Sequence, residues 1–81
     1  MPQIKVYILK SMATGCLYVG ISRNLSRRLR EHKKGQSIGT RGKGPWKLVH
    51  QESFPDYKTA REREKFLKSG KGREWSRSAF G

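Results

Sequence analysis

Hydrophobic residues near the start of the chain fall into two short runs with a polar segment between them. The run 4–10 (IKVYILK) is rich in β-branched and aromatic residues, which favours a β-strand. Residues 11–15 include Ser, Thr and Gly and predict a turn. The run 16–21 (CLYVGI) predicts a second strand, so this part of the chain is expected to form an antiparallel β-hairpin.

A helix is expected next, over residues 25–34. Asn24 is a good N-cap because its side chain can accept a hydrogen bond from the first turn, and Gly35 is placed to end the helix. Leu25 and Leu29 are one turn apart and share a face. We expect this pair of leucines to make the buried contact of the helix.

The second half of the chain predicts one more strand and two helices. A loop with several glycines and basic residues spans 36–45 and precedes a strand over 46–51. A second helix is predicted over 55–69, opened by a Pro-Asp pair and closed by a glycine. A turn at 71–73 and a short helix over 74–79 follow. The order β-β-α-β-α-α predicts an α+β fold, a small three-stranded antiparallel sheet flanked by helices.

The size and charge of the chain narrow the class of partner. Eighty-one residues correspond to one domain, which we assign to residues 1–81. The chain has 19 Lys and Arg against 6 Asp and Glu, and its formal charge is +13 at pH 7. The positive charges repel one another when the chain folds, which disfavours the compact state. Such a charge is therefore typical of proteins that bind a polyanion, and the usual polyanion is nucleic acid. An anionic membrane surface is disfavoured because no long amphipathic basic helix is evident.

The single cysteine and the N-terminal residues argue against a disulfide-bonded, a zinc-binding, a secreted or a membrane-spanning protein. Cys16 is the only cysteine, which excludes an internal disulfide and a cysteine-based zinc site. Its ordinary interpretation is a small apolar strand residue. Lys5 and Lys10 interrupt the first apolar stretch, which therefore does not fit the apolar region of a signal peptide. No run approaches the roughly 20 apolar residues of a membrane span, so we expect a cytoplasmic protein.

The second predicted helix carries a carboxylate on its inward face. Tyr57, Ala60, Glu64 and Leu67 follow helical spacing and share one face, so Glu64 lies on the line that should pack inward. A carboxylate is rarely buried without a partner. One interpretation is a Glu at the rim of the core that is paired with a basic residue. The other is a carboxylate held at a site that a metal or a phosphate approaches.

The first predicted helix carries a complementary pair. Arg28 and His32 are four residues apart and share a face. A guanidinium suits a phosphate because its donors can bind two oxygens at once. The ordinary alternative is a solvated basic face made by Arg27, Arg28 and Arg30, with His32 as a surface histidine.

Taken in order along the chain, these residues resemble the GIY-YIG nuclease superfamily. The matching residues are Tyr7, Tyr18-Val19-Gly20, Arg28, His32 and Glu64. The resemblance runs from about Lys5 to Lys68, and the stretches 41–46 and 60–65 are similar to small stand-alone bacterial members. Those members are related to the N-terminal nuclease domain of the excision-repair endonuclease subunit. The first signature here reads Lys5-Val6-Tyr7, so only its tyrosine matches, and Val19 stands in place of Ile.

The resemblance implies a role for each matching residue. Glu64 would hold one Mg²⁺ or Mn²⁺ ion, with water and phosphate oxygens completing the coordination, and the metal would neutralise charge on the scissile phosphate. Arg28 would stabilise the extra negative charge of the five-coordinate transition state. Tyr7 would deprotonate or position the attacking water, assisted by Tyr18 and His32. A free tyrosine has a pKa of about 10, so Tyr7 would need the metal or Arg28 to act as a base.

Two further points follow from the same resemblance. Gly20 would let the backbone run close to the site without a side chain in the way. The ordinary alternative for Tyr7 and Tyr18 is a pair of rings that pack across a hairpin. The basic residues expected to contact nucleic-acid phosphates, in the first helix and in predicted loops, are Arg27, Arg30, Arg41, Lys43, Lys71 and Arg73.

Three functions are open at this point. The leading hypothesis is a metal-dependent endonuclease, a hydrolase that cuts phosphodiester bonds in DNA, in repair or in the processing of structured DNA. The alternatives are a non-catalytic basic module that binds DNA or RNA and an RNA-binding or ribosome-associated protein. Arg28 and Glu64 together favour the first, because a pure binder has no need of a carboxylate facing a polyanion. Backbone contacts imply weak sequence preference, so specificity is left to DNA shape or to a protein partner.

Overall fold

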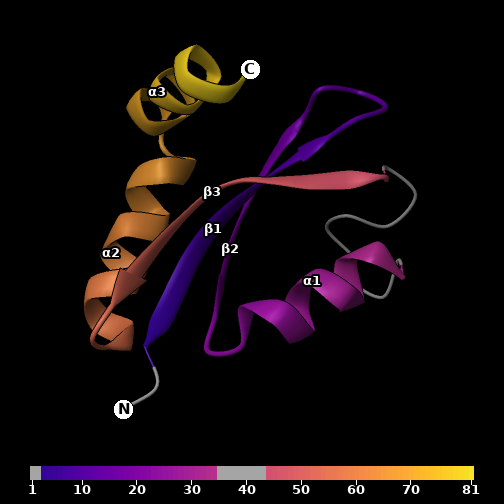
Figure 1. The fold of residues 1–81 in the computed structure, drawn as a ribbon. Helices are drawn as coiled ribbons and strands as arrows, with labels where there is room; N and C mark the ends of the chain where they lie inside the picture. The colour runs from indigo at the N-terminus through magenta and orange to yellow at the C-terminus, as the bar shows by residue number, and fades with distance from the viewer. Residues whose placement is uncertain (1–2, 35–43) are drawn as a thin grey trace.

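The structure, a computed structural model, describes residues 3–34 and 44–81. Three antiparallel strands form one sheet in the order β2-β1-β3, and helices lie on both of its faces (Figure 1). The elements in chain order are β1 (Ile4–Ser11), β2 (Leu17–Ser22), α1 (Leu25–Lys33), β3 (Trp46–Phe54), α2 (Tyr57–Lys68) and α3 (Gly70–Phe80). The α+β prediction is confirmed, and the third strand continues beyond its predicted end at residue 51.

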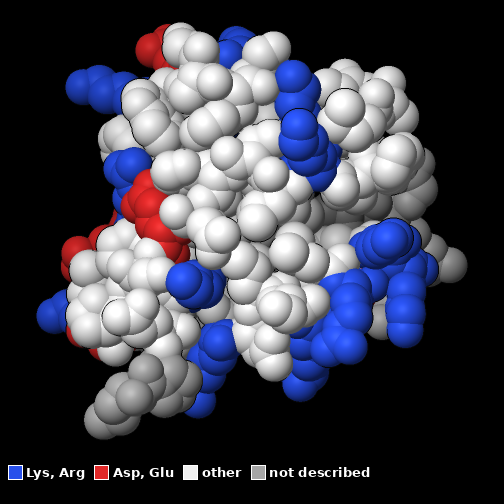
Figure 2. Space-filling model, viewed as in Figure 1, with Lys and Arg blue, Asp and Glu red and all other residues white. Residues whose placement is uncertain are grey.

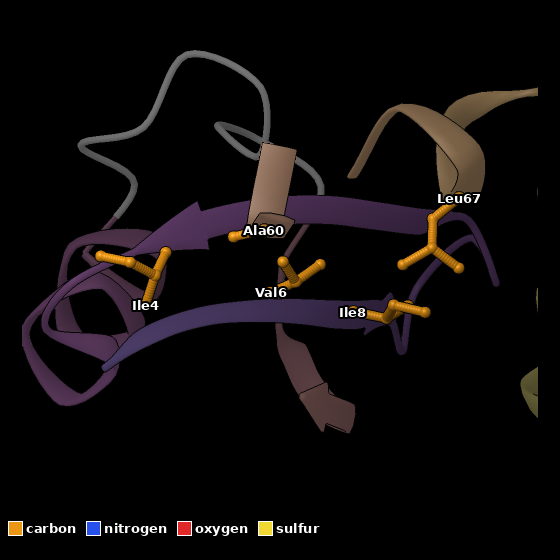
Figure 3. Close-up of a cluster of buried hydrophobic side chains, with 5 residues drawn as sticks. All are labelled: Ile4, Val6, Ile8, Ala60 and Leu67. Atoms are coloured by element: carbon orange, nitrogen blue, oxygen red, sulfur yellow. The ribbon is translucent and has the colours of Figure 1, made fainter. Parts of the chain in front are cut away.

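The central strand β1 is covered on both faces. One face packs against α2 in a cluster of five buried side chains, Ile4, Val6, Ile8, Ala60 and Leu67 (Figure 3). Side chains alternate along a strand, so Tyr7 and Leu9 point to the other face. Both are at most 1% exposed. That second face is the one on which α1 lies (Figure 1).

Local side-chain caps start α1 and α2 where the sequence predicts. The side chain of Asn24 accepts a hydrogen bond from the backbone N–H of Arg27 at 3.1 Å. The carboxylate of Asp56 accepts one from the N–H of Thr59 at 2.8 Å. Each bond satisfies a donor that the first turn of a helix leaves without a partner.

The end of the chain differs from the prediction. Residues 71–73, expected to be a turn, are part of α3, which begins directly after α2. Ser69 separates the two helices, and its hydroxyl accepts a hydrogen bond from the N–H of Gly72 at 3.3 Å. A Cβ at Gly72 would overlap the Phe66 carbonyl and lie 2.6 Å from the Cα of Leu67. This glycine therefore serves the close approach of α3 to α2, which a turn interpretation misses.

The buried residue of α1 is not the one predicted. Leu25 and Leu29 are only half-buried, whereas His32 is 3% exposed. The expectation that the leucine pair makes the buried contact is wrong because the helix turns its histidine into the sheet. The alternative of a surface histidine is wrong for the same reason.

Two expectations concern the chain as a whole. In the parts that the structure describes, no helix is long and apolar enough to cross a membrane. The assignment of residues 1–81 to one domain stays a prediction.

Candidate active site

Tyr7 lies at the centre of the sheet face that α1 covers, and Gly20 makes room for it. The two residues are paired across β1 and β2. A Cβ at Gly20 would overlap the Tyr7 ring and hydroxyl. The phenol therefore crosses β2 at the one position of that strand that carries no side chain. This is a more specific reason for the glycine than an open approach of the backbone to the site.

His32 connects Tyr7 to Tyr18. Its Nε2 is 2.8 Å from the Tyr7 hydroxyl oxygen, a hydrogen bond between side chains that is buried. Tyr18 meets the imidazole edge-on with ring centroids 5.2 Å apart. Trp46 packs against Tyr18 in turn, at 6.3 Å. The two tyrosines thus both contact His32 of α1.

Arg28 joins this cluster from the preceding turn of α1. Its guanidinium makes a hydrogen bond with the Tyr7 hydroxyl, which together with Glu31 raises the pKa of Arg28. Arg28 also donates to the Glu31 carboxylate at 2.7 Å. Because Arg28 can only donate, the Tyr7 oxygen is the acceptor toward it.

Burial controls the protonation of Tyr7 and His32. Burial raises the pKa of Tyr7, although the hydrogen bond and the charge of Arg28 act to lower it. Burial lowers the pKa of His32, and the charge of Arg28 lowers it further. Both side chains are therefore neutral at pH 7. For Tyr7 the desolvation of the phenolate outweighs the guanidinium of Arg28, and its role as a base with the help of a metal ion or Arg28 stays a prediction.

Glu64 makes its ion pairs within its own helix. Its side chain is 12% exposed, and its carboxylate lies 3.1 Å from the Lys68 ammonium and 3.8 Å from the Arg61 guanidinium. The predicted inward line is only partly buried, because Ala60 and Leu67 lie in the core while Tyr57 is 42% exposed. Helix α2 covers the sheet face opposite α1 (Figure 1). The fold thus brings Tyr7, Tyr18, Arg28 and His32 into contact, whereas the ion-pair partners of Glu64 are Arg61 and Lys68 of α2.

The acidic and imidazole groups do not gather into a larger ligand set. Within residues 3–34 and 44–81, no group of three His, Cys, Asp or Glu could hold a metal ion. Glu64 is the carboxylate that the family resemblance selects. Any divalent ion there would take one protein carboxylate and fill its remaining positions with water and phosphate, which Mg²⁺ accepts.

A shallow pocket of about 290 Å³ lies beside Arg28. It is lined by residues at the end of β2 and on α1, and by the first residue of α2, Tyr57. Arg23 stands over the Tyr57 ring at 5.4 Å from its centroid. Arg27 and Glu31 also line the pocket. A phosphate entering here would meet three guanidinium groups.

Basic side chains gather on the same side of the molecule. Figure 2 shows Lys and Arg over α1, whereas the acidic side chains lie mainly toward α2. Arg27 and Arg30 are exposed as predicted, although Arg27 is also 3.2 Å from the Glu31 carboxylate. Lys71 and Arg73 are exposed but belong to α3, so their predicted place in a loop is wrong. Arg41 and Lys43 lie outside the described residues.

Three residues of the site were missed by sequence reasoning. Glu31 could have been found, because it is three and four residues after Arg28 and Arg27, the spacing of helical ion pairs. Arg23 and Trp46 could not, since their contacts with Tyr57 and Tyr18 depend on how the helices and strands pack.

A three-stranded antiparallel sheet flanked by helices, with a Tyr-Tyr-Arg-His cluster on one face, defines a small α+β domain. A family model described as the GIY-YIG catalytic domain matches residues 3–77. The chain therefore belongs to the GIY-YIG family.

The chain is similar to several small UPF0213 proteins. A UPF0213 protein of Natronomonas pharaonis is 43% identical over 65 residues, which cover 79% of this chain and 75% of that protein. One from Clostridium perfringens is 42% identical and covers 78% and 68%. The solution structure of a UPF0213 protein from Bacillus halodurans is similar, with a TM-score of 0.58 and 33% identity over 94% of this chain and 83% of that one.

Proposed function

We propose that this protein is a metal-dependent endonuclease that hydrolyses phosphodiester bonds of structured DNA in the cytosol. The observation that carries the proposal is the buried contact of Arg28 and His32 with Tyr7, next to a pocket lined by guanidinium groups. A basic module that only binds DNA does not need a neutral imidazole hydrogen-bonded to a buried phenol. Membership of the GIY-YIG family supports the same chemistry.

Arg28 binds and stabilises the scissile phosphate. Its side chain is 34% exposed, so it can reach a ligand while Glu31 and Tyr7 hold its direction. A preorganised donor of this kind acts on the charge that develops in the transition state and typically accounts for about 10²–10³ in rate.

The two tyrosines divide the remaining work. Tyr7 is fully buried and its hydroxyl is engaged by His32 and Arg28, so it serves as a positioning residue. Tyr18 is half-buried and packs on His32, which leaves it the better placed tyrosine to contact an attacking water. This division moves the water-contacting role from Tyr7, where the family resemblance first put it, to Tyr18.

Glu64 is the residue that would hold a Mg²⁺ or Mn²⁺ ion through its carboxylate. A bound divalent ion supplies Lewis-acid neutralisation of the phosphate and its leaving oxygen. Lys68 and Arg61 balance the charge of Glu64, and a bound metal ion would compete with these cations for the carboxylate.

The proposal is tested by nicking of supercoiled plasmid with purified protein, in Mg²⁺ and in EDTA. We expect nicking in Mg²⁺ only, and a loss of about a hundredfold or more in Arg28→Gln. Lys33→Gln removes the same charge from an exposed position of the same helix and should nick at nearly the wild-type rate. Equal rates in the Arg28→Gln and Lys33→Gln variants would overturn the role of Arg28. Absence of nicking by the wild-type protein would overturn the proposal that it is an endonuclease.

A second function is favoured by one observation. The Glu64 carboxylate is already paired with cations of α2, as a structural residue at the rim of the core would be. A non-catalytic module that binds DNA or RNA would keep this pairing in Mg²⁺. Such a module binds the same plasmid without cutting it, so the nicking assay separates the two functions.

A further inference from the structure

A larger pocket adjoins the first residues of β2, including Tyr18. Its volume is about 620 Å³, within the range of about 300–1,000 Å³ typical of small-ligand sites. It is formed where the β1–β2 turn and β2 meet the end of α2 and the body of α3. Leu17, Val19 and Leu67 give it an apolar wall.

Cations surround this apolar wall. Lys68 lines the pocket from α2, and Arg73 and Arg77 line it from α3. No Asp or Glu side chain is among the described residues that form it. The combination of an apolar wall with three cations suits a ligand that has a flat apolar part and a negative charge.

Ser76 supplies an independent sign of a ligand. It lines the pocket, is 2% exposed, and its Oγ has no hydrogen-bond partner among the residues that the structure describes. A buried hydroxyl without a partner is unfavourable, and most such groups in native proteins are satisfied. Its Oγ is closed to solvent, so a ligand with a polar edge would satisfy it after a change of the Ser76 rotamer.

The pocket is also connected to the proposed catalytic residues. Tyr18 lines it and packs against His32. Lys68 lines it and is bonded to the Glu64 carboxylate. Tyr18 and Lys68 therefore link the pocket to His32 and to Glu64.

We propose that the pocket receives one unpaired nucleotide of the DNA strand that is cut, adjacent to the scissile phosphate. The base lies on the apolar wall of Leu17, Val19 and Leu67, and a phosphate is bound by Arg73 and Arg77. Ser76 makes a hydrogen bond to the nucleotide. A base can reach such a pocket only after it leaves the stack, which is least costly when it is already unpaired. This inference rests on the proposed function and names its substrate class, DNA with an unpaired nucleotide such as a bulge, gap or flap.

The test is equilibrium binding by fluorescence anisotropy in EDTA, where nothing is cut. The substrates are a perfect duplex, the same duplex with one extrahelical nucleotide, and that duplex with the extra base removed. We expect the bulged duplex to bind about tenfold more tightly than the perfect one, roughly what one charge-assisted hydrogen bond contributes. Removal of the extra base should abolish most of the gain, because the apolar wall then has nothing to cover.

Matched variants connect the preference to the pocket. Arg77→Gln should lose the preference for the bulge, whereas Lys65→Gln, an equal loss of charge on the exposed side of α2, should keep it. In NMR spectra the bulged duplex should shift the amide signals of Val19 and Ser76. Equal affinity for the two duplexes, or a preference that survives in Arg77→Gln, would overturn the proposal.

Further outcomes distinguish failure of the pocket proposal from failure of the proposed nuclease function. If a free nucleoside monophosphate shifts these amides and the bulged duplex does not, the pocket is not a site for a DNA strand and the proposal is overturned. Because binding is measured without metal, a protein that never nicks plasmid but prefers the bulge would refute the nuclease and support the pocket. A protein that nicks without this preference would refute the pocket alone.

Discussion

Replacing Gly20 by alanine is a sensitive probe of the tyrosine cluster. In an ordinary strand this change is favourable by about 0.5–1 kcal/mol, because alanine loses less conformational freedom on folding than glycine. Here the added methyl group would overlap the ring and hydroxyl of Tyr7, which is fully buried and hydrogen-bonded to His32. The strand preference therefore predicts that Gly20→Ala stabilises the protein, whereas the packing predicts that it destabilises the protein.

The magnitude follows from how the overlap can be relieved. If the Tyr7 ring keeps its place, β2 must move, and overpacking of this kind costs about 1–3 kcal/mol. If the ring moves, it loses its hydrogen bond to His32 and leaves a buried group without a partner, which costs about 1–3 kcal/mol. After the strand preference is subtracted, we expect Gly20→Ala to lower the free energy of unfolding by about 1–2 kcal/mol.

The assay is urea unfolding followed by circular dichroism at pH 7, with Gly70→Ala as the control. A Cβ at Gly70 would meet no atom within 4 Å, so this control should be neutral or slightly stabilising. We also expect the pKa of His32 in NMR titration to move toward its ordinary value in Gly20→Ala, because the burial that lowers it is disturbed. A Gly20→Ala protein as stable as wild type, with the His32 titration unchanged, would refute the placement of Tyr7 over this glycine.

Three other predictions follow from the same structure. Gly72→Ala should destabilise the protein by about 1–3 kcal/mol in the same urea assay despite the helix preference for alanine, because its Cβ would overlap the Phe66 carbonyl; a more stable variant would contradict the α2–α3 contact. Burial raises the pKa of Glu52, but hydrogen bonds from Arg63 and His50 outweigh it and hold that pKa below the ordinary 4.5. The resulting stability is present above pH 4.5 and is lost as the pH falls through the folded pKa, so Glu52→Gln should show a smaller decrease in stability between pH 7 and pH 3 than wild type; equal decreases would contradict it. Duplex DNA affinity should fall by about 0.9 log units per log unit of salt for each phosphate neutralised, and a salt-insensitive interaction would contradict the basic face over α1.

Features set by local bonds could be predicted from the sequence. Asn24 and Asp56 were identifiable as caps because each bonds to a backbone N–H three residues later. The four-residue spacing of Arg28 and His32 put them on one face, and the structure brings both to Tyr7. These features depend only on the geometry of one helical turn, so tertiary packing does not change them.

Features set by packing between distant segments could not be predicted. Gly72 was interpreted as part of a turn, because its contact with Phe66 exists only when α3 lies against α2. The burial of His32 depends on the angle of α1 to the sheet, which the Leu25–Leu29 pair does not determine. Helical spacing placed Glu64 on the inward face of its helix. It contained no information about which face of the sheet α2 would cover.

The central claim is that a carboxylate on α2 and a tyrosine cluster on the other face of the sheet act together on DNA. Its most direct test compares Glu64→Gln with Glu62→Gln in Mg²⁺-dependent nicking of supercoiled plasmid. The two changes remove the same charge from neighbouring positions of one helix, but Glu62 is exposed and Glu64 faces inward. We predict that Glu64→Gln is inactive while binding DNA as wild type does, and that Glu62→Gln nicks normally. Undiminished nicking by Glu64→Gln would contradict the account.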